Sequence, residues 1–374
     1  MKKNAKSLKV LKTAKGLQLK LTDNLIKPIV AIVLMMFLSG VTSASGHFVS
    51  GLQAKYPEYD LNDSYVFKSS QQGYTSFIAS ANPSAPGGGE VAASGKDFGE
   101  NGLYNLHIAF DDTFKTGMTY VFSVSGNKVN IYRVDEPDAV EGQKGEKVGK
   151  GEIATIIHLK NGVRAWIGRG KEPFFGNGVD LAKFNAAKQE GRFKPELFKE
   201  SGDLFVESSA SFFVLDIPNE MLGKQVKFFN TTATKIKGEW KQIDRHANVL
   251  FPYIFLSDTP AVQEDHGQHR PLSDVIERRQ TIVHNVFWAI STSNAEQNDP
   301  MRYANKVADL VMPDVLTYRI GTDAHYTMKG LNGRPLDDDA MNTVLHLMMG
   351  VAVDDYAYDE KRYKNKFPYI IHRY

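Results

Sequence analysis

Several oxygen-bearing side chains near the start of the chain have the types and spacing that suit a bound cation. Three of them, Asp60, Asn62 and Asp63, are close neighbours in the sequence, and Asp111-Asp112 follows a later apolar stretch. Ca²⁺ prefers six to eight carboxylate and carbonyl oxygens as ligands. The alternative is turn and capping chemistry, which Asp and Asn often perform before strands. The cation interpretation predicts a site, for example for Ca²⁺, made by His47, Asp60, Asn62, Asp63 and Asp112.

Two further polar stretches carry histidine. In Asp265-His266-Gly267-Gln268-His269 the histidines are three apart and on a helix would share a face that suits Zn²⁺ or Cu²⁺. Because this stretch contains Gly among polar residues, we expect an exposed loop instead. Asp244-Arg245-His246 offers an acid, a base and an imidazole in a row. Adjacent residues of a strand point to opposite faces, so these three side chains should not converge on one substrate.

An acidic triplet, Asp337-Asp338-Asp339, stands before the most regular helical pattern of the chain. Apolar residues recur there with the spacing of one helix face, and Gly350 ends the pattern. We therefore predict a helix over 337–350, capped by Asp337 or Asp338, with Arg334 pairing with one acidic residue. The alternative for the triplet is binding of a cation or a basic partner. The apolar face of this helix consists of Met341, Val344, Leu345 and Met348.

Motifs of several enzyme classes are absent from the sequence. It has no G-x-S-x-G elbow, no Walker A loop, no G-x-G-x-x-G after a strand and no H-E-x-x-H. It also has no Cys, which excludes disulfides, thiolate metal ligands, a Cys nucleophile and a lipid anchor on an N-terminal Cys. We therefore find no recognisable catalytic constellation.

The elements that must position these residues are strands early in the chain and helices late. The turn sequences Ser125-Gly126-Asn127 and Lys160-Asn161-Gly162 are typical of hairpins. Irregular loops are expected over 82–89 and 136–150, which are rich in Gly, Pro or charge. Strands are predicted at 74–79, 104–110, 118–124, 128–134, 151–159, 163–167, 211–217, 225–232 and 239–243, and helices near 180–189, 267–289 and 302–311.

This order of elements predicts a mainly β fold with peripheral helices (α+β). Its core would be an antiparallel sheet or a β-sandwich, with helices concentrated in the C-terminal third. The tail over 354–374, rich in Tyr and Lys, is expected to lie over the surface.

The first 44 residues have the layout of a signal peptide. A Lys-rich region precedes the apolar run Pro28–Val41, and the small residues Thr42-Ser43-Ala44 follow it. The run is shorter than the roughly 20 residues that a membrane-spanning helix needs. We predict a signal peptide at 1–44, with an uncleaved anchor as the alternative, and one domain at 45–374. The processed chain would have no transmembrane span and would be periplasmic or secreted.

Removal of the leader changes the net charge. The whole chain of 374 residues is +2, whereas residues 1–44 carry eight Lys and one Asp. The processed chain is therefore about −5 by simple charge counting. Binding to nucleic acid without sequence preference needs a basic face, so we do not expect a nucleic-acid partner.

Blocks along the chain resemble the DUF4331 family, a bacterial family of unknown function. The resemblance rests on Ser45-Gly46-His47 with the acidic segment at 60–67, on Pro173-Phe174-Phe175, on the strand that ends at Pro218, and on Trp240 to Asn248. It also rests on Leu310 to Tyr318 and on Asn332 to Asp339. The chain departs from the family pattern after His47, where Phe48-Val49-Ser50-Gly51 follows, and after Phe175, where Asp180 comes late. The resemblance implies no known activity.

These observations favour an exported envelope protein that binds an unknown ligand or another envelope protein, without catalytic turnover. The first alternative is a Ca- or Zn-dependent hydrolase that uses His47, Asp60 and Asp63. The second is a structural role in surface assembly. The sequence does not decide whether the protein is an enzyme, and it favours a protein that is not one.

Overall fold

The structure is a computed structural model that describes residues 51–84, 92–199, 202–257, 259–293 and 298–372. All of them belong to one compact unit, Val41–Tyr374. The predicted leader and His47 lie outside the described residues. Within the described part of the chain, no helix is both long enough and apolar enough to cross a membrane.

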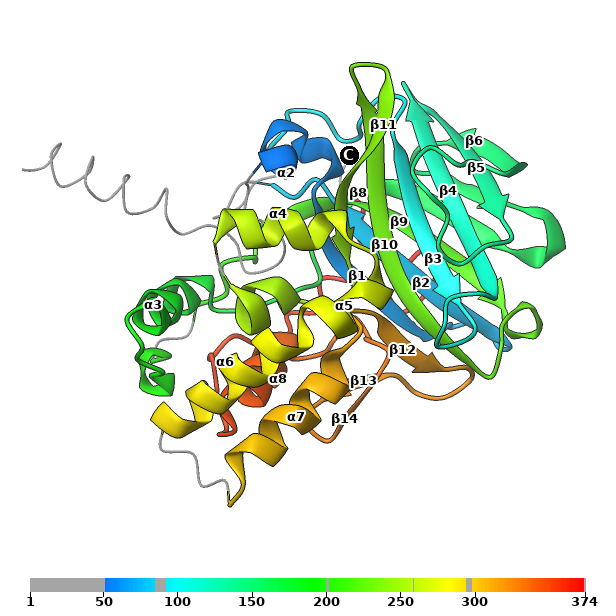
Figure 1. The fold of residues 1–374 in the computed structure, drawn as a ribbon. Coiled ribbons are helices and arrows are strands. Elements are labelled where there is room, and N and C mark those ends of the chain that lie inside the picture. The colour runs from blue at the N-terminus through cyan, green and yellow to red at the C-terminus, as the bar shows by residue number, and fades with distance from the viewer. Residues whose placement is uncertain (1–50, 85–91, 200–201, 258, 294–297, 373–374) are drawn as a thin grey trace, which may run out of the picture. The chain divides into compact units, whose positions relative to one another are not determined.

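Two antiparallel sheets form the body of the protein (Figure 1). Sheet 1 has the strand order β1-β2-β9-β8-β7. Sheet 2 has the order β11-β10-β3-β4-β5-β6, and β12 also pairs with β10. Sheet 1 contains β1 (Leu61–Lys68), β2 (Tyr74–Ala81), β7 (Ile156–His158), β8 (Arg164–Lys171) and β9 (Ser209–Pro218). Sheet 2 contains β3 (Leu103–Ala109), β4 (Gly117–Ser125), β5 (Lys128–Val134), β6 (Glu146–Glu152), β10 (Gln225–Ile236), β11 (Glu239–His246) and β12 (Leu316–Arg319).

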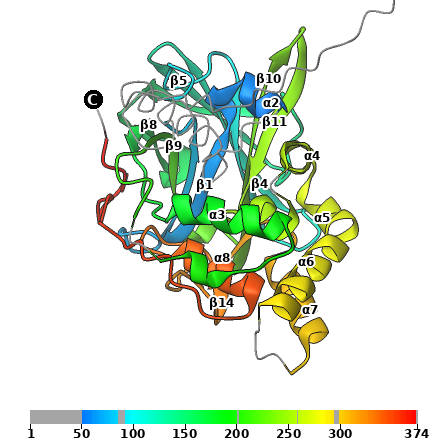
Figure 2. The ribbon, with the colours of Figure 1, turned by 90° about the vertical axis from the view of Figure 1, so that its left-hand side faces the viewer.

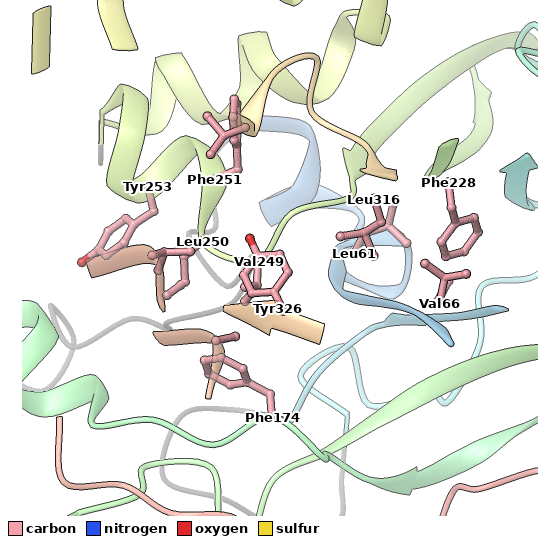
Figure 3. Close-up of a cluster of buried hydrophobic side chains, with 14 of the residues drawn as sticks. Leu61, Val66, Phe174, Phe228, Val249, Leu250, Phe251, Tyr253, Leu316 and Tyr326 are labelled. Carbon is pink, nitrogen blue, oxygen red and sulfur yellow. The ribbon is translucent and has the colours of Figure 1, made fainter. Parts of the chain in front are cut away.

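The two sheets pack face to face through aromatic side chains. Phe213 of β9 stacks on Tyr104 of β3, with ring centroids 4.3 Å apart. Phe77 of β2 meets Phe228 of β10 edge to face at 5.2 Å. Figure 3 shows Phe228 close to Val66 of β1, with both side chains in the buried apolar cluster. These contacts confirm the predicted β-sandwich.

The outer face of sheet 1 is also covered, although one face of such a sheet often meets water. Every residue of β9 is buried. The cover comes from the C-terminal tail, whose Tyr369 and Ile370 pack in one cluster with Trp166 and Phe212. The backbone N–H of Lys171 donates to the carbonyl of Ile371 at 3.0 Å. The tail therefore lies over the sheet, as expected from the sequence.

The helices gather on one side of the sandwich, and most of them follow residue 259 (Figures 1 and 2). This confirms their expected concentration late in the chain. Helix α4 packs along β11, and α6 contacts α5, α7 and α8. The α-helices are α2 (Gly51–Lys55), α3 (Gly178–Gln189), α4 (Pro260–Gln268), α5 (Pro271–Glu277), α6 (Arg279–Thr292), α7 (Pro300–Val311) and α8 (Ala340–Met349). Shorter elements are the 3₁₀-helices η1 (Pro57–Tyr59), η2 (Lys160–Gly162), η3 (Pro195–Leu197) and η4 (Asn219–Met221), the π-helix η5 (Pro252–Leu256), and the hairpin of β13 (His325–Thr327) with β14 (Gly330–Asn332).

Helix α8 agrees with its predicted pattern, but its cap differs. Its apolar face is buried, and Gly350 ends it in the left-handed conformation with φ 68°. The N-cap is Asp339, whose side chain accepts from the backbone N–H of Asn342. Asp337 and Asp338 precede the cap, so the prediction that one of them caps the helix is wrong.

The predicted strand over 151–159 is wrong because the chain changes sheets within it. β6 pairs with β5 in sheet 2, whereas β7 pairs with β8 in sheet 1. The crossing lies between them, where Ala154 has φ 62°. The loop expected over 136–150 ends early, because β6 begins at Glu146 and pairs with β5.

Candidate functional site

A surface pocket of about 370 Å³ forms where four segments of the chain meet. It lies at the end of β1, and residues of the C-terminal tail form one of its walls. This volume is within the usual range for small-molecule sites, roughly 300–1,000 Å³. The lining consists of Phe67 to Ser70, Asp323 and Ala324, Pro335 to Asp337, Tyr363 to Asn365, and Tyr369.

The lining combines aromatic rings with donors and acceptors of both charges. Phe67, Tyr363 and Tyr369 supply rings, and Lys68 carries an exposed ammonium. The Lys68 ammonium lies 3.6 Å from the carboxylate of Asp323, which is more exposed than Lys68. The lining contains two Lys and two Asp, which are Lys68, Lys364, Asp323 and Asp337. Because their charges cancel, the pocket has no strong preference for a charged ligand.

The tail side of the pocket is held by a buried hydroxyl network around Tyr369. The Tyr369 hydroxyl accepts from the backbone N–H of Ser70 at 3.0 Å and lies 3.0 Å from the hydroxyl of Ser76. Ser76 in turn donates to Asp216 at 2.6 Å, and Arg164 forms an ion pair with the same carboxylate. This network anchors one wall of the pocket to sheet 1.

The opposite wall is held by Arg334, which is fully buried. Its backbone exchanges two hydrogen bonds with Val66 of β1, at 2.9 and 3.1 Å. Its guanidinium forms ion pairs with Asp63 and, at 3.1 Å, with Asp338. The same group lies over the ring of Tyr65, 4.3 Å from its centroid. Arg334 therefore fixes the 335–337 segment against β1, and both segments line the pocket.

Glu172 completes the polar group beneath this wall. Its carboxylate accepts from the side-chain amide of Asn62 at 2.7 Å and from the backbone N–H of Phe174 at 3.2 Å. Burial, with the nearby charge of Asp63, raises the pKa of Glu172 to about 8. Burial likewise raises the pKa of Asp338 to about 7. Three carboxyl groups, those of Asp63, Asp338 and Glu172, lie around the Arg334 guanidinium. Some of these carboxyl groups therefore stay protonated near neutral pH.

The raised pKa of Glu172 predicts a pH effect on stability. The ordinary pKa of 4.5 rises on folding, so the folded state holds the proton more tightly. The resulting stabilisation is complete below about pH 4.5 and is lost as the pH rises through about 8. Glu172→Gln removes the titration. We expect its stability relative to wild type to improve by about 1–3 kcal/mol between pH 6 and pH 9.

Urea unfolding at several pH values measures this difference. Glu190→Gln is the control, because Glu190 is an exposed carboxylate beside Arg192. Its stability curve should run parallel to that of the wild type. If Glu172→Gln also runs parallel, Glu172 does not carry the predicted proton.

A second buried ionic group joins β11 to the helices. Arg245 forms two hydrogen bonds with the carboxylate of Asp274, at 2.8 and 3.0 Å. His266 of α4 lies 2.9 Å from Asp314 through Nε2, and its Nδ1 lies 3.0 Å from the Arg245 guanidinium. Burial and the charge of Arg245 lower the pKa of His266. A neutral imidazole that donates to Asp314 and accepts from Arg245 satisfies this geometry.

Ser64 and His246 form a pair that the sequence did not suggest. The Ser64 hydroxyl lies 2.9 Å from Nδ1 of His246 and accepts from the amide of Asn230 at 2.7 Å. A serine nucleophile beside an imidazole is a hydrolase arrangement in exposed sites. Here Ser64 is fully buried, and burial lowers the pKa of His246 to about 3. The pair therefore links β1 to β11 and has no access to a substrate.

Asp60 and Asp244 bring two carboxyl groups together in the interior. Both are at least nine-tenths buried. Asp244 accepts from the amide of Gln53 at 2.8 Å and from the backbone N–H of Leu61 at 2.9 Å. Burial raises the pKa of Asp244 to about 7, and burial together with the charge of Asp244 raises that of Asp60.

The structure brings Asn62 and Asp63 together but places Asp112 elsewhere. The side-chain amide of Asn62 lies 3.4 Å from the carboxylate of Asp63. Asp63 pairs with Arg334, and Asn62 donates to Glu172. Asp112 is exposed and pairs with Lys227 at 3.0 Å. His47 lies outside the described residues. Among the residues that the structure describes, no three His, Asp or Glu side chains gather as a metal site.

The two histidine stretches have different outcomes. The exposed loop expected at 265–269 is wrong, since residues 265–268 belong to α4 and His266 is buried. Gly267 permits this close approach, because a Cβ there would lie 2.8 Å from the Asp244 carboxylate. Asp244, Arg245 and His246 lie at the end of β11, and each contacts a different set of partners. They do not converge, as expected from strand geometry.

Comparisons with protein-family models, with curated proteins and with solved structures found no match to this chain. The resemblance to the DUF4331 family stays a prediction. The geometry of the surface pocket and of the buried polar groups is therefore what indicates a function.

Proposed function

We propose that the protein is an exported binding protein without catalytic turnover, and that the surface pocket holds its ligand. The observation that carries the proposal is the pocket itself, built from segments far apart in the chain and held in place by Arg334 and Tyr369. The leader-like sequence at 1–44 supports export to the periplasm or the medium.

The serine and histidine side chains that suit nucleophilic catalysis lie outside the surface pocket. Ser64, His246 and His266 are buried and do not line the surface pocket. Each is engaged in contacts that join strands or helices. In the surface pocket, Lys68 and Asp323 are exposed and face each other as an ion pair. This division favours binding over turnover.

The lining suits a small, neutral, polyhydroxylated ligand such as a saccharide. The rings of Phe67 and Tyr363 offer apolar faces for the C–H groups of a sugar ring. Ser70 and Asn365 supply hydroxyl and amide groups for its hydroxyls. Small-molecule sites usually have a mainly apolar lining with a few polar groups. This lining is richer in polar groups, which suits a ligand with many hydroxyls.

Titration calorimetry of the purified chain with neutral mono- and disaccharides tests this proposal, with citrate as a charged probe. We expect saccharide binding, and a loss of about tenfold in affinity for Tyr363→Ala, equivalent to about 1.4 kcal/mol. Tyr358→Ala is the matched control, because Tyr358 belongs to the same tail, is exposed and lies outside the pocket. Its affinity should match that of the wild type.

Two results would count against the proposal. One is the absence of binding to every neutral saccharide in the set. The other is saccharide binding that Tyr363→Ala leaves unchanged. NMR spectra of the bound sugar over one day test turnover, and the appearance of a product would replace the binding role with an enzymatic one.

A further inference from the structure

Two buried carboxylates and two buried amides gather where α2, β1, β11 and α4 meet. Asp60 precedes β1, Asp244 and Gln242 belong to β11, and Gln53 belongs to α2. All four side chains are more than nine-tenths buried. This oxygen cluster, defined as Gln53, Asp60, Gln242 and Asp244, is separate from the surface pocket.

Three oxygens of the cluster have no hydrogen-bond donor within the described chain. They are Oδ1 of Asp60 and the amide oxygens of Gln53 and Gln242. Buried polar atoms nearly always have a partner, and leaving one unsatisfied costs roughly 1–3 kcal/mol. Gln53 donates to Asp244, Asp60 lies near the Asp244 charge, and Gln242 donates to Gly267. The three acceptors therefore belong to one connected group of residues that suits a cation.

The orientation of both amides follows from their neighbours. The amide nitrogen of Gln53 donates to the carboxylate of Asp244 at 2.8 Å, and that of Gln242 donates to the carbonyl of Gly267 at 2.6 Å. Turning either amide over would bring its oxygen against another acceptor. The atoms left without partners are therefore carbonyl oxygens, which are acceptors and metal ligands.

Gly267 brings the parts of the cluster together. A Cβ at this position would lie 2.8 Å from Oδ1 of Asp244 and 3.1 Å from the amide nitrogen of Gln53. A side chain at this position would therefore displace the Asp244 carboxylate or the Gln53 amide. The carbonyl of the same Gly267 accepts from Gln242, so this glycine is next to three members of the cluster.

The chemistry of this donor set selects the ion. Oxygen atoms from carboxylates and amides suit a hard cation, and the cluster has neither the imidazole nor the thiolate that Zn²⁺ prefers. Two carboxylates offset the charge of a divalent ion, so the buried site becomes neutral. Mg²⁺ demands near-ideal octahedral geometry and keeps several waters, whereas Ca²⁺ accepts irregular sets of six to eight oxygens.

We propose that the oxygen cluster is a Ca²⁺ site, with Asp60, Asp244, Gln53 and Gln242 as side-chain ligands. The ion joins α2 to the edge strand β11 and to the start of β1. Its role is to stabilise the N-terminal side of the folded domain. The site is independent of the ligand proposed for the surface pocket.

Calorimetric titration of the EGTA-treated, purified chain with CaCl₂ tests the site. We expect one equivalent of Ca²⁺ to bind, with a higher Tm in excess CaCl₂ than in EGTA, since an ion that binds only the folded state stabilises it. MgCl₂ should bind at least tenfold more weakly. Asp60→Asn and Gln53→Met should each weaken Ca²⁺ binding at least tenfold. Both variants are checked for native circular dichroism, and Gln53→Met supplies the test if Asp60→Asn does not fold.

Asp112→Asn is the matched control, since Asp112 is an exposed carboxylate outside the cluster. Its Ca²⁺ affinity should equal that of the wild type. No binding of Ca²⁺ to the wild type would overturn the proposal and assign the cluster a shared proton instead. Binding that Asp60→Asn and Gln53→Met leave unchanged, or that Asp112→Asn abolishes, would place the ion elsewhere.

Discussion

Replacing Arg334 with methionine is expected to lower the free energy of unfolding by about 3–5 kcal/mol, the usual cost of breaking a buried ion pair on one side. Asp63 and Asp338 would then lose their common cation while staying buried. The cation–π contact with Tyr65 would also be lost. Urea unfolding at pH 7, followed by circular dichroism, measures the change.

The control for this experiment is Arg279→Met. Arg279 pairs with Asp309 at the surface, where an ion pair contributes roughly 0–1 kcal/mol. A second comparison separates stranded charge from lost packing. If stranded carboxylates cause the loss, adding Asp63→Asn and Asp338→Asn to Arg334→Met should recover part of the stability. A single variant as stable as Arg279→Met would mean that Arg334 does not hold this wall.

Arg334 also shows how far the sequence could predict this site. Its pairing with one residue of the acidic triplet was expected, and the structure shows that this residue is Asp338. The pairing with Asp63 spans most of the domain, and no local pattern encodes which distant carboxylate a buried guanidinium meets. The Asn332-Gly333 turn is the local sequence feature that indicates a close approach of the backbone next to Arg334. Gly333 has φ 71°, and a Cβ there would lie 2.3 Å from the carbonyl of Val66.

Local periodicity predicted the fold class well, and it failed where tertiary contacts decide. The hairpin between β4 and β5 was predicted from turn chemistry, which acts over a few residues. The exposed loop at 265–269 was wrong because polar composition says nothing about burial against β11. His266 is stabilised there by Asp314 and Arg245, both far away in the sequence.

The predicted cation ligands illustrate the same limit. Asp60, Asn62 and Asp63 are close in sequence, but distant parts of the chain decide which groups they meet. An irregularity in the pairing of β1 between Leu61 and Asp63 lets the neighbours Asn62 and Asp63 lie in one polar group. Asp63 faces Arg334, whereas Asp60 faces Asp244. The sequence could not identify Gln53 and Gln242 as ligands of the proposed ion. An amide becomes a candidate ligand only when the structure shows that its oxygen is buried without a donor.

Replacing Phe213 with alanine is the second large effect that we expect. The Phe213 ring is fully buried between the sheets and contacts the rings of Phe98, Tyr104 and Phe122. Removal leaves a cavity at the centre of the sandwich, which typically costs about 3–5 kcal/mol. Urea unfolding measures the loss, and Ile276→Ala is the control because Ile276 is 86% exposed.

The neighbouring residue turns this experiment into a test of the fold. Phe212 points to the outer face of sheet 1, where a sandwich with one solvated face would leave it exposed. It is instead fully buried in one cluster with Trp166 and Tyr369. Phe212→Ala should therefore also cost about 3–5 kcal/mol. A nearly neutral Phe212→Ala beside a costly Phe213→Ala would mean that the tail does not cover this face, and the wall of the surface pocket that Tyr369 anchors would then be lost with it.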